Sequence, residues 1–161
     1  MSRGYFCIAL ENPKNALNVG SVMRLAGCYG ASVVVVQAPR YRAAPTDTMR
    51  AHRHLPMIIG TDVWDHVPYG CVPVVLEFDR DGGSIPLPEF VHPERAYYIF
   101  GPEDGSVRPE TVAKVRYRVH VPTRQCLNLA MTVGTVLYDR LMKRSVRAAA
   151  AEVVAENHAR R

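Results

Sequence analysis

The sequence has 161 residues (17.9 kDa), with 20 Lys and Arg against 15 Asp and Glu, and a formal net charge of +5. This length suits one domain, which we expect to span residues 1–161, and the 48% apolar and 22% charged residues exclude a disordered or collagen-like chain. No apolar run reaches the roughly 18 residues that cross a membrane, so we expect no membrane partner, while the modest basic excess suits an acidic partner such as a nucleic acid.

The four cysteines and six histidines are scattered along the chain. The cysteines form no CxxC pair, and no group of Cys and His has the spacing of zinc ligands, so we expect no metal site. The first fifteen residues lack the apolar segment and cleavage site of a signal peptide. Together these features favour a reduced, cytoplasmic protein.

The first half of the chain alternates apolar runs with helical spacing. Strands are predicted over residues 5–10 and 32–36, the second of them a β-branched run typical of a strand buried on both faces. Between them, apolar residues recur at helical spacing over residues 18–29, with Asn18 as the expected N-cap and Gly30 as the stop. Weaker patterns indicate short helices over residues 46–53 and 62–66.

The second half of the chain continues this alternation. Strands are predicted over residues 72–78, 96–100 and 117–121, with a short helix over residues 109–115. A long helix is predicted over residues 127–144, and its Ala-rich continuation leaves open an extension to about residue 157. The alternation predicts an α/β fold, with a mostly parallel sheet and helices on both faces. Such sheets bind ligands beyond the carboxyl ends of their strands.

Three segments that follow predicted strands carry glycines and polar side chains. In the first, Asn18, Gly20 and Arg24 lie at the start of a helix, and the six-residue spacing of Asn18 and Arg24 predicts that they lie near one face. The second is the turn FGPEDGSV over residues 100–107, and the third is the segment VPTRQCLNLAMTVGTVLYD over residues 121–139. Taken singly, they are also explained as a capped surface helix, an exposed acidic turn and a C-terminal core helix.

In combination, the three segments resemble the motifs of the SpoU (TrmH-like) branch of the SPOUT RNA 2′-O-methyltransferases. The first motif, N-x-G-x-x-x-R-x-A, is matched by Asn18, Gly20, Arg24 and Ala26. The second, G-x-E-x-x-G, is matched in part, because Gly105 falls one place early after Gly101 and Glu103. The third has Cys126 in place of the usual Ser before Leu-Asn, and it ends in Leu-Tyr-Asp instead of Leu-Tyr-Glu.

The resemblance implies a fold and a cofactor. Members of this branch form a deep trefoil knot near the C-terminus, here in the segments around residues 100–105 and 121–128. They bind S-adenosyl-L-methionine in the knot, largely through backbone groups. Carried over by position, the cofactor contacts are Leu76, Glu77, Gly101, Val121, Cys126, Leu127 and Asn128.

The resemblance also implies an activity, methyl transfer to a ribose 2′-hydroxyl of RNA. It extends to the minimal members, which include the enzymes for the wobble cytidine or uridine of tRNA. The implied catalytic residues are Arg24, Asn18, Glu103 and Asn128. A guanidinium is a poor proton acceptor, so we expect Arg24 to stabilise the developing alkoxide, held in place by Glu103 and Asn18.

Binding surfaces are expected as well. Basic residues that follow the second strand or lie in the knot loop are candidates for RNA binding: Arg40, Arg42, Arg50, Arg53 and Arg124. The branch forms homodimers through the knot helices, which complete the active site across subunits. The sequence leaves open whether Leu129, Val133, Val136 and Leu137 are buried in the core or in the dimer.

Two other functions are compatible with parts of the sequence. A non-catalytic RNA-binding protein could share the fold, although the presence of Asn18, Arg24, Glu103 and Asn128 argues against it. An unrelated nucleotide-binding α/β protein is disfavoured, because the sequence contains neither GxGxxG nor GxxxxGK[ST].

Overall fold

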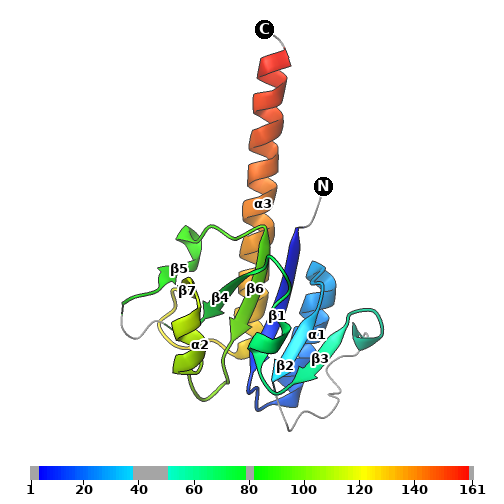
Figure 1. Ribbon diagram of the computed structural model, residues 1–161. Coiled ribbons are helices and arrows are strands. Elements are labelled where there is room, and N and C mark those ends of the chain that lie inside the picture. The colour runs from blue at the N-terminus through cyan, green and yellow to red at the C-terminus, as the bar shows by residue number, and fades with distance from the viewer. Residues whose placement is uncertain (1–3, 38–50, 79–81, 160–161) are drawn as a thin grey trace.

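A seven-stranded sheet forms the centre of the molecule in the computed structural model, which describes residues 4–37, 51–78 and 82–159 (Figure 1). The strand order is β3-β2-β1-β6-β4-β7-β5, and every described pairing is parallel. The strands are β1 (Tyr5–Glu11), β2 (Val34–Gln37), β3 (Met57–Gly60), β4 (Val72–Leu76), β5 (Ile85–Pro86), β6 (Arg95–Phe100) and β7 (Tyr117–His120). The predicted α/β fold with a parallel sheet is confirmed.

The two edge strands, β3 and β5, were not predicted from the sequence. Strand β3 has only four residues. Its apolar residues Ile58 and Ile59 are both exposed, so its sequence lacks the alternation of apolar and polar residues that indicates a half-buried strand. Strand β5 has only two residues, and its Pro86 is tolerated because an edge strand does not need every backbone donor. Short edge strands therefore leave little trace in the sequence.

In the described part of the chain, three α-helices and three 3₁₀ helices cover the sheet. The α-helices are α1 (Ala16–Tyr29), α2 (Pro109–Lys114) and α3 (Leu129–Ala159), and the 3₁₀ helices are η1 (Ala51–Arg53), η2 (Val63–His66) and η3 (Leu87–Glu89). Most of the short helix expected over residues 46–53 lies outside the described residues, whose first residues after the gap form η1.

The start of α1 differs from the prediction, whereas its end agrees with it. The N-cap is Asn15, whose side chain accepts a hydrogen bond from the backbone N–H of Leu17 at 2.9 Å. The predicted cap, Asn18, is wrong, because this residue is buried inside the first turn of the helix. Gly30 ends the helix as predicted, with a left-handed φ of 76° that suits glycine.

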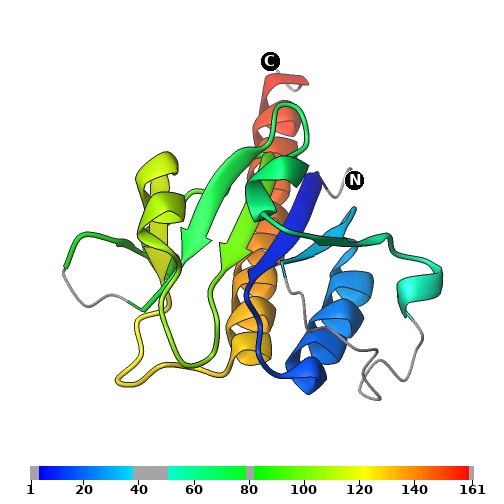
Figure 2. The same cartoon turned by 60° about the horizontal axis from the view of Figure 1, so that its bottom comes forward.

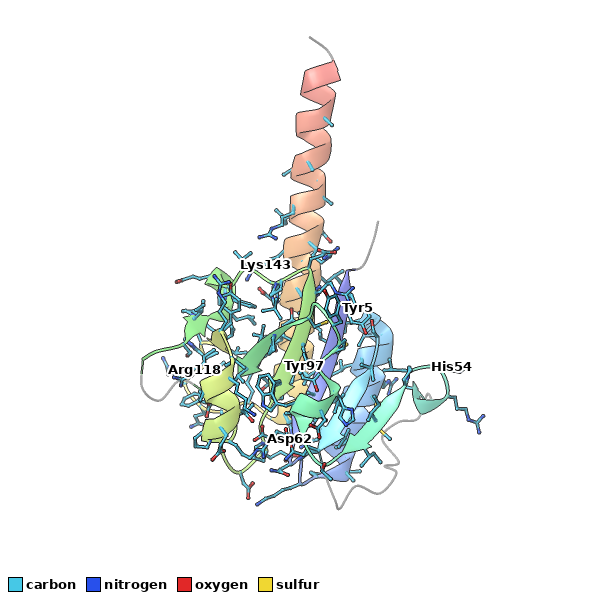
Figure 3. The ribbon with its side chains drawn as sticks, viewed as in Figure 1. Tyr5, His54, Asp62, Tyr97, Arg118 and Lys143 are labelled. Carbon is cyan, nitrogen blue, oxygen red and sulfur yellow. The ribbon has the colours of Figure 1, made fainter. Side chains whose placement is uncertain are left out.

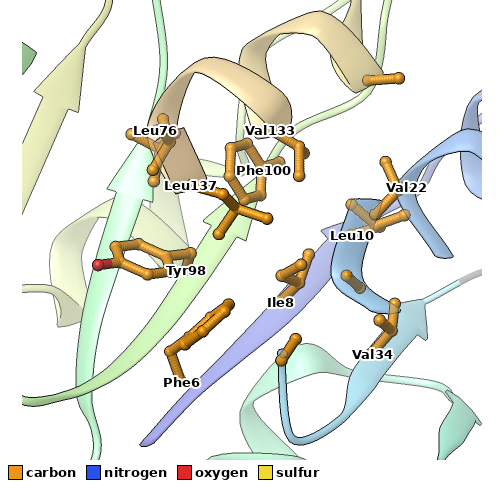
Figure 4. Packing of buried hydrophobic residues seen from close by; sticks show 14 of the residues in the cluster. Phe6, Ile8, Leu10, Val22, Val34, Leu76, Tyr98, Phe100, Val133 and Leu137 are labelled. Atoms are coloured by element: carbon orange, nitrogen blue, oxygen red, sulfur yellow. The ribbon is translucent and has the colours of Figure 1, made fainter. Parts of the chain in front are cut away.

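Each face of the sheet has its own hydrophobic cluster. On one face, alternate strand residues such as Ile8, Leu10 and Phe100 pack against Val22 of α1 and Leu137 of α3 (Figure 4). The intervening residues point to the other face. There, Cys7, Ala9 and Tyr97 pack with Val63 of η2 and Val107, with α2 beside them. The predicted helices on both faces are confirmed.

Helix α3 is much longer than the sheet that it covers. Its 31 residues span about 46 Å, and its second half projects past the amino ends of the strands (Figure 1). The buried residues Leu129, Val133, Val136 and Leu137 belong to the core of the single chain, which settles the choice left open by the sequence. Among the described helices, none combines the length and apolar character needed to cross a lipid bilayer.

The position of β7 bears on the predicted knot. Strand β7 lies between β4 and β5 in the sheet, although it follows both in the sequence. Strands β4 and β5 therefore lie on either side of β7, and residues 121–128 connect the end of β7 to the start of α3 (Figure 2). This strand order is compatible with a knotted C-terminal segment, and the knot itself stays a prediction.

A buried polar cluster fastens α3 to the segment before β6. The Asp139 carboxylate accepts a hydrogen bond from His92 Nε2 at 2.8 Å, so Nδ1 is left to accept one from the Tyr98 hydroxyl at 2.6 Å. Burial lowers the pKa of His92 to about 4. Asp139 opposes this shift, and the positive charges of Arg140 and Lys143 add to it. The folded protein therefore holds this histidine neutral.

The cluster predicts a pH dependence of stability. Between pH 7 and pH 5 the unfolded chain binds a proton at His92 that the folded protein rejects, so the free energy of unfolding falls by about 2 kcal/mol. Urea titrations at both pH values measure this change. The His92→Gln variant should lose most of it, and an equal pH dependence in both proteins would contradict the assignment.

Candidate functional site

A pocket lies at the carboxyl ends of β4, β6 and β7, where parallel sheets bind their ligands. It is open to solvent, and its empty space of about 680 Å³ includes part of that solvent. Six of the seven predicted cofactor contacts line it, namely Leu76, Glu77, Gly101, Val121, Cys126 and Leu127. The seventh, Asn128, lies next to them in sequence and takes another role.

Gly101 shapes the wall of this pocket. A Cβ atom at this position would lie 2.9 Å from the backbone nitrogen of Val107 and 3.0 Å from its Cγ2 atom. The loop after β6 thus folds back so closely on its own start that only glycine fits without a backbone shift. Pro102, Gly105 and Ser106 in the same loop also line the pocket, and their contribution was not predicted from the sequence.

Three of the predicted catalytic residues form one hydrogen-bonded chain. The Glu103 carboxylate accepts hydrogen bonds from the backbone N–H groups of Lys14 at 2.9 Å and Asn15 at 3.2 Å, and from Asn18 Nδ2 at 2.7 Å. Asn18 Oδ1 in turn accepts from Asn128 Nδ2 at 3.0 Å. The chain therefore connects the first turn of α1, the loop after β6 and the start of α3.

Asn128 also caps α3. Its Oδ1 atom accepts a hydrogen bond from the backbone N–H of Ala130 at 2.9 Å, which satisfies a donor in the first turn of the helix. One amide side chain thus fixes the helix start with its oxygen and binds Asn18 with its nitrogen.

The surroundings of Glu103 favour its charged form. Partial desolvation raises the pKa of this carboxyl group, but the hydrogen bonds from Asn18, Lys14 and Asn15 lower it by more, so the pKa lies below its ordinary value. The carboxylate is therefore ionised at neutral pH. The hydrogen-bonded chain that depends on this charge is lost only as the pH falls through that lowered pKa.

Arg24 lies apart from this chain of hydrogen bonds. Its side chain is exposed on α1, whereas Asn18 is buried, so the prediction that the two residues lie near one face is wrong. Residues six positions apart differ by about 120° around a helix. The hydrogen-bond donors to Glu103 are Lys14, Asn15 and Asn18. Glu103 therefore contacts the start of the helix that carries Arg24, in place of the expected contact with Arg24 itself.

A second polar cluster at the carboxyl ends of the strands was not predicted. Glu11 ends β1 fully buried, and its Oε1 atom accepts hydrogen bonds from the backbone N–H of Arg108 at 2.8 Å and from Arg108 Nε at 2.9 Å. Its Oε2 atom accepts from the Thr111 hydroxyl at 2.7 Å. Arg108 also pairs with Asp62 at 3.2 Å, a residue seen near this edge of the sheet in Figure 3. The cluster fixes the far end of the loop that begins at Gly101.

The predicted RNA-binding arginines are only partly described. Arg53 is exposed in η1, and Arg124 is exposed in the segment between β7 and α3. Arg40, Arg42 and Arg50 lie outside the described residues. Within the described part of the chain, no three His, Cys, Asp or Glu side chains are placed to hold a metal ion.

The Glu11 cluster leads to a prediction. Glu11→Gln removes the buried charge that binds Arg108, so we expect the free energy of unfolding to fall by about 3 kcal/mol. We also expect faster hydrogen exchange of the backbone amides over residues 101–108. The control is Glu110→Gln, which makes the same charge change at an exposed position in the first turn of α2. Equal effects of the two variants would argue against the role of Glu11.

Solved structures with the same fold are found among RNA-modifying enzymes. The SpoU methyltransferase AviRb from Streptomyces viridochromogenes, in complex with AdoMet, aligns with a TM-score of 0.78 and 17% identity over 91% of this chain and 63% of its own. An AdoMet-bound rRNA methyltransferase from Sinorhizobium meliloti aligns with a TM-score of 0.74 and 19% identity over 86% of this chain and 56% of its own. The present chain thus spans about 60% of the length of these two proteins.

A third structure matches in length as well. It comes from a study of the 2-OH methylation of C/U34 on tRNA, and it aligns with a TM-score of 0.74 and 21% identity over 89% of this chain and 99% of its own. No curated protein sequence is significantly similar to the chain. At these identities the structural matches establish the fold alone.

The family is established by the sequence itself. The family model of the SpoU rRNA methylases matches residues 5–138, a range that begins at β1 and ends within α3. This range includes the pocket, the hydrogen-bonded chain from Glu103 to Asn128, and Arg24. The chain therefore belongs to the SpoU rRNA methylase family.

Proposed function

We propose that this protein is an S-adenosyl-L-methionine-dependent methyltransferase that methylates a ribose 2′-hydroxyl of tRNA. The observation that carries the proposal is the hydrogen-bonded chain from Glu103 through Asn18 to Asn128. It joins three segments that are far apart in the sequence, and Glu103 also lines the pocket at the carboxyl ends of the strands. A purely structural domain has no need of a charged chain at the rim of an open pocket.

The residues that line the pocket suit the cofactor in their chemistry. Leu76, Val121 and Leu127 offer apolar contacts, and the close turn at Gly101 exposes backbone groups of the loop after β6. When bound, S-adenosyl-L-methionine supplies a methyl group on a positively charged sulfur. We assign Leu76, Gly101, Val121 and Leu127 to holding it, with Glu77 and Cys126 at the edges of the same pocket.

Arg24 is the residue that we assign to the substrate hydroxyl. A ribose hydroxyl attacks poorly until its proton leaves, and the resulting negative charge requires a positively charged partner. A guanidinium is a poor proton acceptor, so Arg24 stabilises the alkoxide and orients the ribose or its phosphate, and it does not act as a base. The contacts of Glu103 with residues 14–18 set the position of the helix that carries it.

The proposed function also includes a second copy of the chain. Leu17 of α1 and Met131 and Tyr138 of α3 are exposed apolar side chains, with 47%, 64% and 55% of their surface accessible. Met131 and Tyr138 are seven positions apart and thus share one face of α3. We propose that these side chains pack in a homodimer formed through α1 and α3, which places the exposed Arg24 near the partner.

One test of the proposed function concerns the cofactor. In Gly101→Ala, the added methyl group displaces the backbone at Val107, so we expect affinity for S-adenosyl-L-methionine to fall at least about tenfold in isothermal calorimetry. Gly83→Ala is the control, because its methyl group would meet only the end of the Arg118 side chain at 3.7 Å. Unchanged affinity in a folded Gly101→Ala protein would show that S-adenosyl-L-methionine does not bind in this pocket.

Another test of the proposed function concerns methyl transfer. Arg24→Ala should bind S-adenosyl-L-methionine and melt like the wild type, while the transfer rate falls about 100-fold or more, because the alkoxide loses its charged partner. Arg116→Ala, at an exposed position before β7, is the matched control. Near-normal turnover of Arg24→Ala would refute the assignment.

The product tests the reaction itself. After incubation with labelled S-adenosyl-L-methionine, mass spectrometry of tRNA nucleosides should find the label in a 2′-O-methylated cytidine or uridine, and the wobble position is the first site to map. Label on a base would overturn the ribose assignment. Tight RNA binding without any transfer would favour a non-catalytic RNA-binding protein.

A further inference from the structure

A second hollow lies at the opposite end of the sheet from the cofactor pocket. It occupies about 760 Å³, is open to solvent, and lies where α3 passes the segment before β6. We call it the helix-base hollow and define it by its polar lining residues, which are His92, Glu94, Arg140, Lys143, Arg144 and Arg147. Figure 3 shows Lys143 at the point where α3 leaves the body of the molecule.

The basic residues of the hollow lie outside the part of the chain that matches the family model. That match ends at residue 138, and all four basic residues come from the continuation of α3. Arg140 lies three, four and seven positions after the core residues Leu137, Val136 and Val133. Arg144 and Arg147 lie four and seven positions after Arg140. Residues at these spacings share one face of a helix. The face of α3 that is buried against the sheet thus continues as a basic face where the helix projects.

Arg140 gives the hollow a buried positive charge. Only 2% of this residue is exposed, and its guanidinium donates to the carbonyl oxygens of Pro93 at 2.7 Å and Glu94 at 2.9 Å and to the Tyr98 hydroxyl at 3.0 Å. No carboxylate among residues 4–37, 51–78 and 82–159 forms an ion pair with it. Neutral partners leave its charge in place, so it contributes a positive potential to the hollow.

The remaining charges do not cancel this potential. Lys143 pairs with Asp139 at 2.7 Å, and Arg144 pairs with Glu94. Arg147 is exposed and pairs with no acidic group within the described ranges. Among the described ion pairs of the hollow, the carboxylates are those of Asp139 and Glu94, beside the four cations of Arg140, Lys143, Arg144 and Arg147. His92 is neutral and does not offset the positive charge. Burial lowers the pKa of His92, and the nearby charges of Arg140 and Lys143 lower it further.

We infer that the helix-base hollow binds the phosphate backbone of the RNA substrate, with Arg147 and Arg144 as the phosphate ligands. This inference rests on the proposed function. A guanidinium matches phosphate in geometry and in charge, and the excess of positive charge selects an anion over a neutral peptide surface. Along α3, Arg147 lies 15 residues beyond Thr132 of the cofactor pocket, about 22 Å away. One RNA thus contacts both ends of the sheet.

The hollow remains available in the proposed homodimer. Met131, Tyr138 and Met142 lie on the side of α3 roughly opposite Arg140 and Arg147, since helical residues advance by about 100° each. The apolar side faces the second copy, and the basic side faces the RNA. The two surfaces do not compete for the same side chains.

The test compares two arginine variants of the full chain. Affinity for bulk tRNA is measured by fluorescence anisotropy at several salt concentrations, together with affinity for S-adenosyl-L-methionine. In Arg147→Gln we expect the Kd for tRNA to rise about five- to tenfold and the salt slope to fall by about one, because one phosphate contact is lost. Cofactor affinity and melting temperature should not change. Arg116→Gln, with the same charge loss outside the hollow, should bind tRNA more nearly like the wild type.

Each other outcome has a distinct meaning. Equal tRNA affinity and salt slope in Arg147→Gln and wild type would overturn the inference even where the wild type methylates RNA. If inorganic phosphate binds at Arg147 while the variant keeps the RNA slope, the hollow takes a small anion and the RNA assignment is wrong. An Arg147-dependent slope without methyl transfer would leave the hollow in place and refute the proposed reaction.

Discussion

The negative charge of Glu103 is the constraint on which the candidate site depends. This carboxylate accepts three hydrogen bonds from residues 14–18, which are 85 to 89 positions away in the sequence. Through Asn18 the same charge reaches Asn128 and the first turn of α3. Hydrogen bonds to an ionised group are stronger than neutral ones. The starts of both helices on one face of the sheet therefore have their positions set by one ionised side chain.

The loop after β6 is held at both ends by carboxylates of different kinds. Near its beginning, Glu103 of the loop itself reaches out to α1 at the rim of the pocket. At its end, Arg108 is bound by Glu11, a carboxylate that is fully buried at the end of β1. The loop also closes on itself, because its start at Gly101 lies close to the backbone of Val107. A loop fixed in this way presents its backbone groups with little freedom left to lose, and binding costs less conformational entropy as a result.

Sequence reasoning predicted what local pattern and burial determine, and it missed what depends on distant partners. The apolar runs of β1, β4 and β6 identified the sheet and the edge at which the pocket lies, since the strands are buried and parallel. The type and place of Asn18 predict an N-cap, but a glutamate 85 residues away fixes it inside the helix, and Asn15 caps instead. Glu11 and Arg108 lie 97 positions apart, and no spacing in the sequence connects them.

The length of α3 has a geometric consequence for substrate selection. The helix begins beside the cofactor pocket and carries Arg147 past the other end of the sheet, without a break between them. Each residue of a helix adds about 1.5 Å and 100°, so the stretch from Asn128 to Arg147 fixes both a spacing and a direction. With the proposed contacts at both ends, α3 sets the distance between the methylated ribose and a remote phosphate. An RNA is therefore selected by its shape as well as by the nucleotide in the pocket.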